Sequence, residues 1–191
     1  MNEPSPIFVF HKPRGVVVTR SDERGRRTVF DLLPAWVRDD GWKPVGRLDL
    51  DSRGLLLFVH DGKLQEALAR PGAHEKVYEV WVRGRVTDAQ VTALRTGVET
   101  PQGVMRAKDV QPQGGTGAKS RMLVTLSEGR NRQIRRMFGA LKDEQTGRAL
   151  KVLELKRASF GPLKLDIESG KWRWLTAAEC DALNHPATRP F

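Results

Sequence analysis

A loop that carries carboxylates stands directly before an apolar run, where an acidic side chain would be partly removed from water. Residues 46–54 read Gly-Arg-Leu-Asp-Leu-Asp-Ser-Arg-Gly, and three leucines follow at 55–57. Arg47 and Arg53 could keep Asp49 ionised at the edge of a buried strand. Such a carboxylate can serve as a nucleophile or as a base. On physical grounds alone, however, a solvated loop with local ion pairs explains this segment better.

A second segment combines a high density of arginine with a helical pattern. Residues 128–138 read Glu-Gly-Arg-Asn-Arg-Gln-Ile-Arg-Arg-Met-Phe. If Asn131 caps a helix, the spacing of three and four residues places Arg132, Arg135 and Arg136 on one face. Like charges on one face repel each other, so a nucleic-acid backbone, a carboxylate or both must offset them. A solvated basic face is the weaker alternative, because Arg is well suited to bind phosphate and carboxylate in a fork.

Composition indicates a polyanionic partner. The 191 residues include 33 Lys and Arg against 23 Asp and Glu, a formal charge of +10 with a pI near 10.2. This excess favours nucleic acid as the partner, although a basic surface that binds nothing explains charge alone nearly as well. The single cysteine, Cys180, excludes an intramolecular disulfide, and we expect a cytoplasmic protein. No apolar stretch is long enough to span a membrane, so no membrane partner is expected.

The pattern of elements predicts an α+β fold with a mixed, mostly antiparallel sheet and flanking helices, because strands outnumber helices and often follow one another. Strands are expected at residues 7–10, 16–19, 55–60, 77–82, 104–110, 122–126, 152–158 and 172–175. Helices are expected at residues 63–69, 87–95 and 131–141, and another from Thr176, where Glu179 completes a capping box. We expect residues 1–191 to form one domain or two closely packed subdomains, and, without a heptad pattern, a monomer.

Three segments in a fixed order resemble the motifs of the pseudouridine synthases. The first comprises residues 46–49 with 54–57 and 61–62, the second is Lys76-Val77-Tyr78, and the third is residues 128–137. The third is similar to the late motif of the ribosomal small-subunit (RsuA-type) branch. Ser52 stands where the family usually has Thr, and His60 where Asn is common. The chain starts almost directly in the catalytic domain, so it resembles the subgroup that lacks an S4 domain and modifies large-subunit ribosomal RNA.

This resemblance implies roles for five residues in the conversion of a flipped-out uridine to pseudouridine. Asp49 would be the catalytic carboxylate, and Arg135 would pair with it and keep it charged. Arg47 would help to displace the uridine, Tyr78 would pack against the base, and Ile134 would line the pocket. Core or edge packing is the ordinary role of a tyrosine in a strand.

The remaining basic residues of these segments are assigned to the RNA backbone. They are Arg130, Arg132 and Arg136, with Lys12 and Arg14 adding to the same groove. Isomerisation is redox-neutral and activates no water for hydrolysis, so neither a cofactor nor a metal is expected. The four histidines are scattered and have no ligand spacing. Trp81, Trp172 and Trp174 alternate with polar residues, which favours core packing over stacking on bases.

Two other functions are compatible with parts of this pattern. A non-catalytic RNA-binding protein, such as a ribosome assembly factor, would need the arginines but neither Asp49 nor Tyr78. A metal-dependent nuclease could use Asp49, Asp51 and Asp61, and a chelator would abolish its activity. Both leave the order of the three motifs unexplained.

Overall fold

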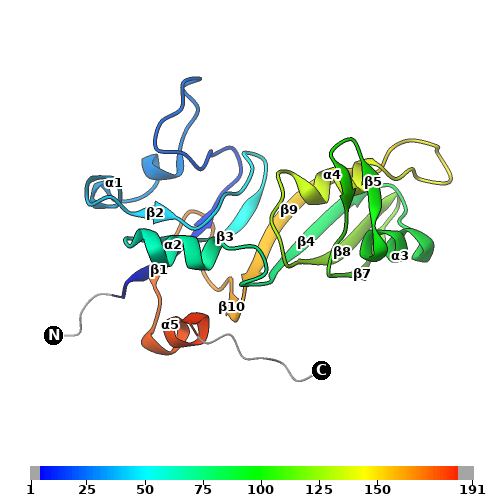
Figure 1. The fold of residues 1–191 in the computed structure, drawn as a ribbon. Helices are drawn as coiled ribbons and strands as arrows, with labels where there is room; N and C mark the ends of the chain where they lie inside the picture. Colours follow the sequence, from blue (N-terminus) through cyan, green and yellow to red (C-terminus); the bar gives the residue numbers. More distant parts are fainter. Residues whose placement is uncertain (1–4, 185–191) are drawn as a thin grey trace. The chain divides into compact units, whose positions relative to one another are not determined.

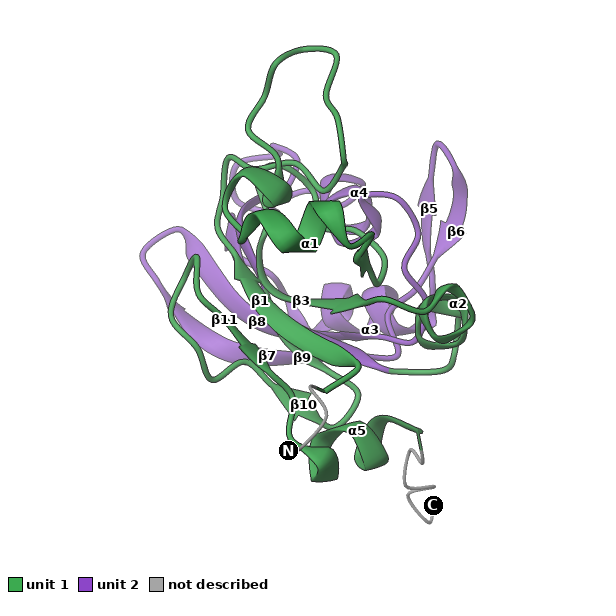
Figure 2. Cartoon of the chain, turned by 90° about the vertical axis from the view of Figure 1, so that its left-hand side faces the viewer, with its two compact units in different colours: residues 1–74, 157–191 green, residues 75–156 purple. Residues whose placement is uncertain are grey.

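The computed structural model describes residues 5–184, which form two compact units (Figure 2). Among the described residues, unit 1 comprises residues 5–74 and 157–184, and unit 2 comprises Glu75–Lys156. Each unit combines antiparallel strands with short helices (Figure 1), so the predicted α+β class is confirmed. None of the helices within residues 5–184 is long and apolar enough to cross a membrane.

The sheet of unit 1 is built around its first strand. Strand β1 pairs in antiparallel fashion with β11 on one side and with β3 on the other, and β2 and the end of β9 extend the sheet. The strands are β1 (Ile7–Lys12), β2 (Lys43–Pro44), β3 (Arg53–Val59), the last residues of β9 (Lys151–Phe160), β10 (Leu163–Lys164) and β11 (Trp172–Trp174).

Both faces of this sheet are buried, which explains why β1 and β3 read as continuous apolar runs. One face packs Ile7, Val9 and Leu57 against Leu183 of the last helix. The other face is aromatic: Phe8 stacks on Phe58 with ring centroids 4.8 Å apart, and four tryptophans and two further phenylalanines contact this pair. Trp172 and Trp174 pack against this aromatic cluster, as the sequence predicts.

Four short helical segments complete unit 1. They are η1 (Val29–Asp31), α1 (Ala35–Asp39), α2 (Gly62–Ala69) and α5 (Ala177–Asn184). Asp61 caps α2 by accepting a hydrogen bond from the Leu64 amide at 2.7 Å. The predicted capping box at α5 is confirmed, because the Thr176 amide donates to Glu179 and the Glu179 amide donates to the Thr176 hydroxyl.

Unit 2 is a sheet with the strand order β9-β4-β8-β7, accompanied by a separate hairpin and two helices. Its elements are β4 (Lys76–Arg83), α3 (Asp88–Thr96), β5 (Val98–Thr100), β6 (Gly103–Met105), β7 (Asp109–Thr116), β8 (Lys119–Leu126) and α4 (Gln133–Gly139). Helix α3 agrees with the helix predicted at residues 87–95: Thr87 caps it, and Gly97 ends it. The β7–β8 hairpin turns at residues 117–118, because Thr116 pairs with Lys119, and the pairing is irregular between Pro112 and Gly115.

Two predicted strands differ from the structure. Residues 16–19 contribute only an isolated bridge between Val17 and Thr28, because no neighbouring strand continues the pairing. The strand predicted at 104–110 is divided into β6 and β7, which belong to different sheets. β-branched residues mark extended backbone in both places, but extended backbone becomes a strand only where a partner pairs with it.

Candidate active site

A buried lysine holds the loop that carries Asp49 by hydrogen bonds to its backbone. We call residues 46–52 the aspartate loop. The Lys12 ammonium, fully buried at the end of β1, donates hydrogen bonds to the carbonyl oxygens of Ser52 at 2.7 Å and of Asp49 and Pro13 at 3.0 Å each. Three acceptors satisfy its three donors. One side chain therefore joins the first strand to the backbone of the catalytic candidate.

The environment of Lys12 also lowers the pKa of its ammonium group. Burial lowers its pKa to about 8, although the carboxylates of Asp49 and Asp51 act in the opposite direction. The expectation that Lys12 contacts the RNA backbone must be corrected, because an ammonium buried among three carbonyls cannot reach a phosphate. Its place indicates that it positions the aspartate loop instead. Arg14, by contrast, is exposed in the turn that follows.

Gly54, which follows the aspartate loop in β3, permits a close approach of two backbones. Its φ is +122°, and a Cβ added there would lie 2.3 Å from the carbonyl oxygen of Arg157 in β9. Only glycine fits such a contact. The buried guanidinium of Arg157 reinforces it by donating to the Leu55 carbonyl at 2.6 Å. Gly54, a glycine of the first motif, thus allows the backbones of β3 and β9 to lie in close contact.

The functional side chains of the aspartate loop lie at its surface. Arg47 is exposed and Asp49 is half-buried, while Leu48 between them is buried. The loop is closed by hydrogen bonds from the Ser52 amide to the Asp49 carbonyl at 3.0 Å and from the Gly15 amide to the Leu50 carbonyl at 2.7 Å. A fixed backbone therefore presents a half-buried carboxylate next to an exposed arginine.

In unit 2, the arginine-rich segment begins its helix later than predicted. Helix α4 starts at Gln133 and is preceded by Arg132, whose φ of 51° places it in the left-handed region. The prediction that Asn131 caps the helix is wrong. Arg132 therefore stands outside the helix, so it does not share a helical face with Arg135 and Arg136. Among residues 5–184, it is the only non-glycine residue with a positive φ, a conformation that costs about 1 kcal/mol or more.

A residue that sequence analysis did not single out holds this segment in place. We call residues 128–132 the arginine loop. The Gln133 side chain is buried, and its amide nitrogen donates to the Arg106 carbonyl and to the Glu128 carboxylate, both at 3.0 Å. Its side-chain oxygen accepts from the Arg130 amide at 3.1 Å. The available sequence signal was that Gln133 lies four residues before Met137, on the apolar face of the helical pattern.

The other predicted residues of unit 2 are distributed between surface and core. The Arg130 guanidinium is exposed and donates to the Val104 carbonyl at 2.9 Å, and that of Arg136 donates to the Asn131 side chain at 2.9 Å. Arg135 is half-buried and donates to the Val152 carbonyl of β9 at 3.1 Å. Tyr78 and Ile134 are both buried.

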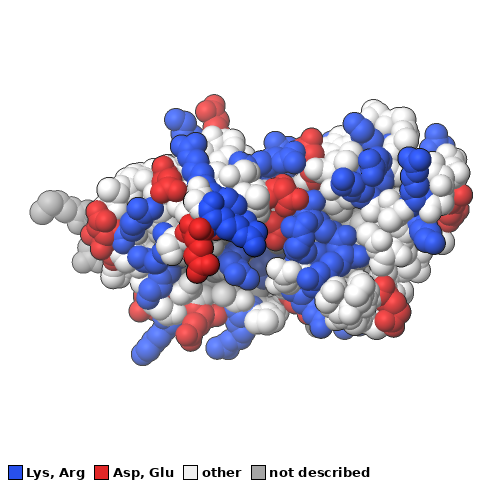
Figure 3. Space-filling model, turned by 90° about the horizontal axis from the view of Figure 1, so that it is seen from above, with Lys and Arg blue, Asp and Glu red and all other residues white. Residues whose placement is uncertain are grey.

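The predicted residues thus form two sets. Unit 1 brings together Lys12, Arg47 and Asp49, and unit 2 carries the tyrosine, the isoleucine and the four arginines. The predicted ion pair between Asp49 and Arg135 joins residues of different units and stays a prediction. Among the described residues, no group of three or more His, Cys, Asp or Glu side chains could hold a metal ion. Lys and Arg are more frequent than Asp and Glu on the face that Figure 3 shows.

Comparison with known proteins finds pseudouridine synthases. A family model described as RNA pseudouridylate synthase matches residues 6–140. A Vibrio cholerae protein named ribosomal large subunit pseudouridine synthase B is 40% identical over 170 residues, which cover 88% of this chain and 50% of that protein. The protein of the same name from Escherichia coli K12 is 37% identical over 187 residues, which cover 96% and 62%.

A solved structure agrees with these relatives. A crystal structure of a pseudouridylate synthase superimposes with a TM-score of 0.78 at 28% sequence identity, covering 96% of this chain and 75% of that one. The chain spans about half to three fifths of the length of the curated relatives described above.

Proposed function

The chain belongs to the RNA pseudouridylate synthase family, and from this premise we propose that it isomerises a specific uridine of ribosomal RNA to pseudouridine. Relatives named for the large ribosomal subunit support large-subunit RNA as the substrate. We further propose a cytoplasmic monomer that uses neither metal nor cofactor. The single observation that carries the proposal is the half-buried Asp49, set on a loop whose backbone a buried lysine fixes, within the span that the family model matches.

The reaction sets clear requirements for the site. The bond between N1 of the base and C1′ of the ribose breaks, the base turns, and a bond forms between C5 and C1′. C5 then loses its proton to solvent, and N1 gains one. Because every atom of the nucleotide except exchanged protons is retained, the protein has to supply a carboxylate, a pocket for the free base and a means of extracting the nucleotide.

Asp49 supplies the carboxylate, as nucleophile or as base. Arg47, exposed beside it, displaces the uridine from its stack. Tyr78 and Ile134, whose side chains are buried, provide the apolar wall against which the base packs. Arg135, by the resemblance of its motif, is proposed as the cationic partner of the Asp49 carboxylate.

Three arginines in and after the arginine loop bind the RNA backbone: Arg130 and Arg132 are exposed, and Arg136 in α4 is half-buried. Arg130, Arg132 and Arg136 contact phosphates, and each contact contributes to the salt dependence of binding. The left-handed backbone at Arg132 supports this role, because strained conformations of this kind are retained mainly where the surrounding structure serves a function.

Tritium release tests the proposal. Ribosomal RNA that has never met the enzyme is labelled with tritium at uridine C5, and release is measured for the wild type and for Asp49→Ala without added metal. We expect release by the wild type alone. Release by neither protein, on naked RNA and on ribosomal subunits alike, would favour the non-catalytic RNA-binding protein. Release by both would show that the catalytic residue is misassigned.

A further inference from the structure

The two faces of the unit 2 sheet differ in character. Along β4 and β8 the inward residues are buried, whereas Glu79, Trp81 and Leu123 on the other face are half-buried and Arg83 and Arg121 are exposed. Tyr78 lies on the buried face, so this second face, which we call the open face, points away from the catalytic tyrosine. The expectation that Trp81 packs in a core is therefore wrong.

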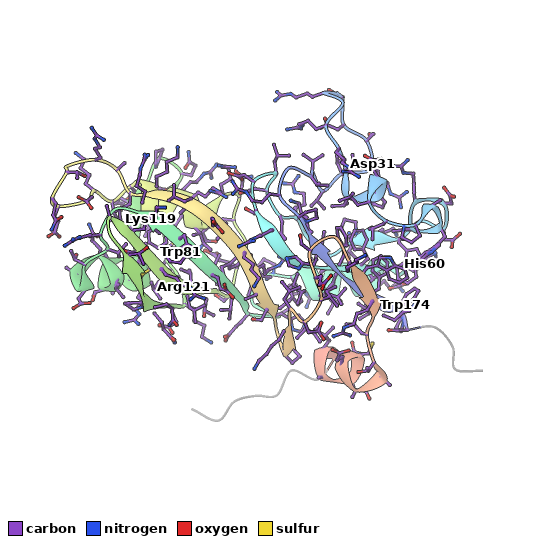
Figure 4. The ribbon with its side chains drawn as sticks, turned by 180° about the vertical axis from the view of Figure 1, so that it is seen from behind. Asp31, His60, Trp81, Lys119, Arg121 and Trp174 are labelled. Carbon is purple, nitrogen blue, oxygen red and sulfur yellow. The ribbon has the colours of Figure 1, made fainter. Side chains whose placement is uncertain are left out.

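Basic side chains concentrate around Trp81 on the open face. Trp81 is directly opposite Arg121 in the pairing of β4 with β8, and the Arg121 guanidinium carbon lies 6.0 Å from the centre of the indole ring. The next outward-facing pair along the strands is Arg83 opposite Lys119, and both are exposed. Figure 4 shows Trp81, Lys119 and Arg121 together on neighbouring strands.

The positive charges of Arg83, Lys119 and Arg121 on the open face are not balanced by an equal number of carboxylates. Glu79 contacts two cations, Arg121 at 3.6 Å and Lys156 at 3.4 Å. Within residues 5–184, neither Arg83 nor Lys119 has an ion pair with a carboxylate. Like charges directly opposite each other on two strands destabilise a sheet. An anionic partner would remove this cost.

From this placement we propose that the open face binds a second, single-stranded segment of the RNA, separate from the nucleotide that is modified. Arg83 and Lys119 contact successive phosphates, while a base stacks on the Trp81–Arg121 pair. A half-exposed aromatic ring beside unpaired cations on an antiparallel sheet meets both needs of single-strand binding, namely a stacking platform and backbone neutralisation. The inference uses the proposed function only in taking RNA as the ligand.

Fluorescence anisotropy with a fluorescein-labelled oligouridylate of twelve nucleotides tests the proposal in the full chain. Arg83→Gln combined with Lys119→Gln should weaken binding about 3- to 30-fold and reduce the slope of log K against log salt by about 1.4, since each phosphate contact on a single strand contributes about 0.7. The matched control is Lys164→Gln with Lys171→Gln, which removes two exposed cations from unit 1. It should leave affinity and slope at the wild-type values.

Trp81 provides an independent readout. Trp81→Ala should lower affinity about fivefold or more with an unchanged salt slope, and Trp81→Phe should restore most of it, because stacking needs a ring rather than a charge. RNA substituted with 5-iodouridine should form a photo-crosslink to Trp81. If the indole had only a structural role, no crosslink would form. Trp81→Ala would then not lower the affinity while leaving the salt slope unchanged.

Two results would overturn the inference. One is wild-type affinity and slope in the Arg83 and Lys119 double variant together with no crosslink to Trp81. The other is unchanged oligouridylate binding by that variant combined with loss of its association with protein-containing ribosomal particles, which would assign the open face to a protein partner. Failure of the proposed function would appear differently, as absence of tritium release by the wild type while these binding differences persist.

Discussion

The aspartate loop and the arginine loop are both held by one buried polar side chain, but the two side chains differ in charge. In unit 1 the Lys12 ammonium donates to three backbone carbonyls and lies near the Asp49 carboxylate. In unit 2 the neutral Gln133 amide joins Glu128, Arg130 and the Arg106 carbonyl. A cation supports the loop that must hold a carboxylate, and an uncharged amide supports the loop that already carries two arginines.

The loops also differ in how tightly their backbones are enclosed. Gly54, which follows the aspartate loop, touches the backbone of β9, whereas a Cβ added at Gly129 in the arginine loop would meet nothing within 4 Å. The first loop is therefore built to keep one geometry, and the second is built to present side chains at the surface. We infer that the first serves the chemistry and the second serves RNA binding.

The largest effect is expected at Gly54, and Gly129 in the other loop is its matched comparison. Gly54→Ala should lower the free energy of unfolding by about 3 to 5 kcal/mol, because the new methyl group overlaps the Arg157 carbonyl and the backbone must leave a φ of +122°. Gly129→Ala should change it by less than about 0.5 kcal/mol. Urea denaturation of both variants measures this difference, and equal stabilities would remove the contrast between the loops.

The next effect concerns Lys12, the charged side chain that holds the aspartate loop. Lys12→Met keeps the length of the side chain but leaves three carbonyls without their donor, so the free energy of unfolding should fall by about 2 to 3 kcal/mol. Tritium release at saturating RNA should fall about a hundredfold, because the Asp49 backbone loses its support. Lys63→Met, at an exposed position in α2, is the control. Wild-type release by a folded Lys12→Met protein would show that Lys12 does not position the loop.

A smaller effect is expected for Gln133, the neutral side chain that holds the arginine loop. Gln133→Ala removes the side chain that joins Glu128, Arg130 and the Arg106 carbonyl, and should cost about 1 to 2 kcal/mol of stability. Its main consequence should be weaker RNA binding, because the arginine loop is no longer ordered in advance. Binding and turnover are compared with the exposed control Gln111→Ala. A fall in maximal turnover with unchanged affinity would reverse the roles of the two loops.

Two further predictions concern the pH dependence of stability. The pKa of Lys12 is about 8 in the folded protein and 10.5 for a free lysine, so the unfolded chain binds more protons between these values. This group should therefore make stability rise as the pH is raised from about 8 to about 10.5, and Lys12→Met should lack that rise. Denaturation midpoints across this range measure it, and parallel curves for the two proteins would contradict the burial of a charged ammonium.

A slope of the same sign is expected in acid from Glu179, which belongs to a different part of unit 1, because its pKa is also lower in the folded protein than in the unfolded chain. Its hydrogen bonds with Arg173 lower its pKa from 4.5 to about 2. Its contribution is complete above pH 4.5 and should be lost as the pH falls from about 4.5 to about 2. Comparison of acid denaturation with Glu179→Gln tests this.

Local features of the fold could be predicted, because neighbouring residues determine them. The Thr87 cap, the Gly97 helix end and the Thr176–Glu179 capping box each depend on residues within one or two helical turns. The strands at residues 16–19 and 104–110 could not be predicted correctly, because pairing depends on distant partners.

Part of the candidate site was also beyond sequence reasoning, for the same reason. A lysine after a strand indicates a surface charge, and only the approach of the aspartate loop from 37 residues away makes Lys12 a buried clamp. The contact between Gly54 and Arg157 depends on a strand far along the chain. The left-handed Arg132 has no signal in its residue type, because Gly or Asn would be expected there.

The central claim is that Asp49 performs the chemistry while the arginines bind RNA, and Asp49→Asn separates the two most directly. With the variant and the wild type each in excess over tritiated ribosomal RNA, RNA affinity should stay within about twofold, because the amide keeps the shape of the side chain. Single-turnover tritium release should fall at least about a thousandfold. Release at the wild-type rate by Asp49→Asn, with RNA fully bound, would contradict the account.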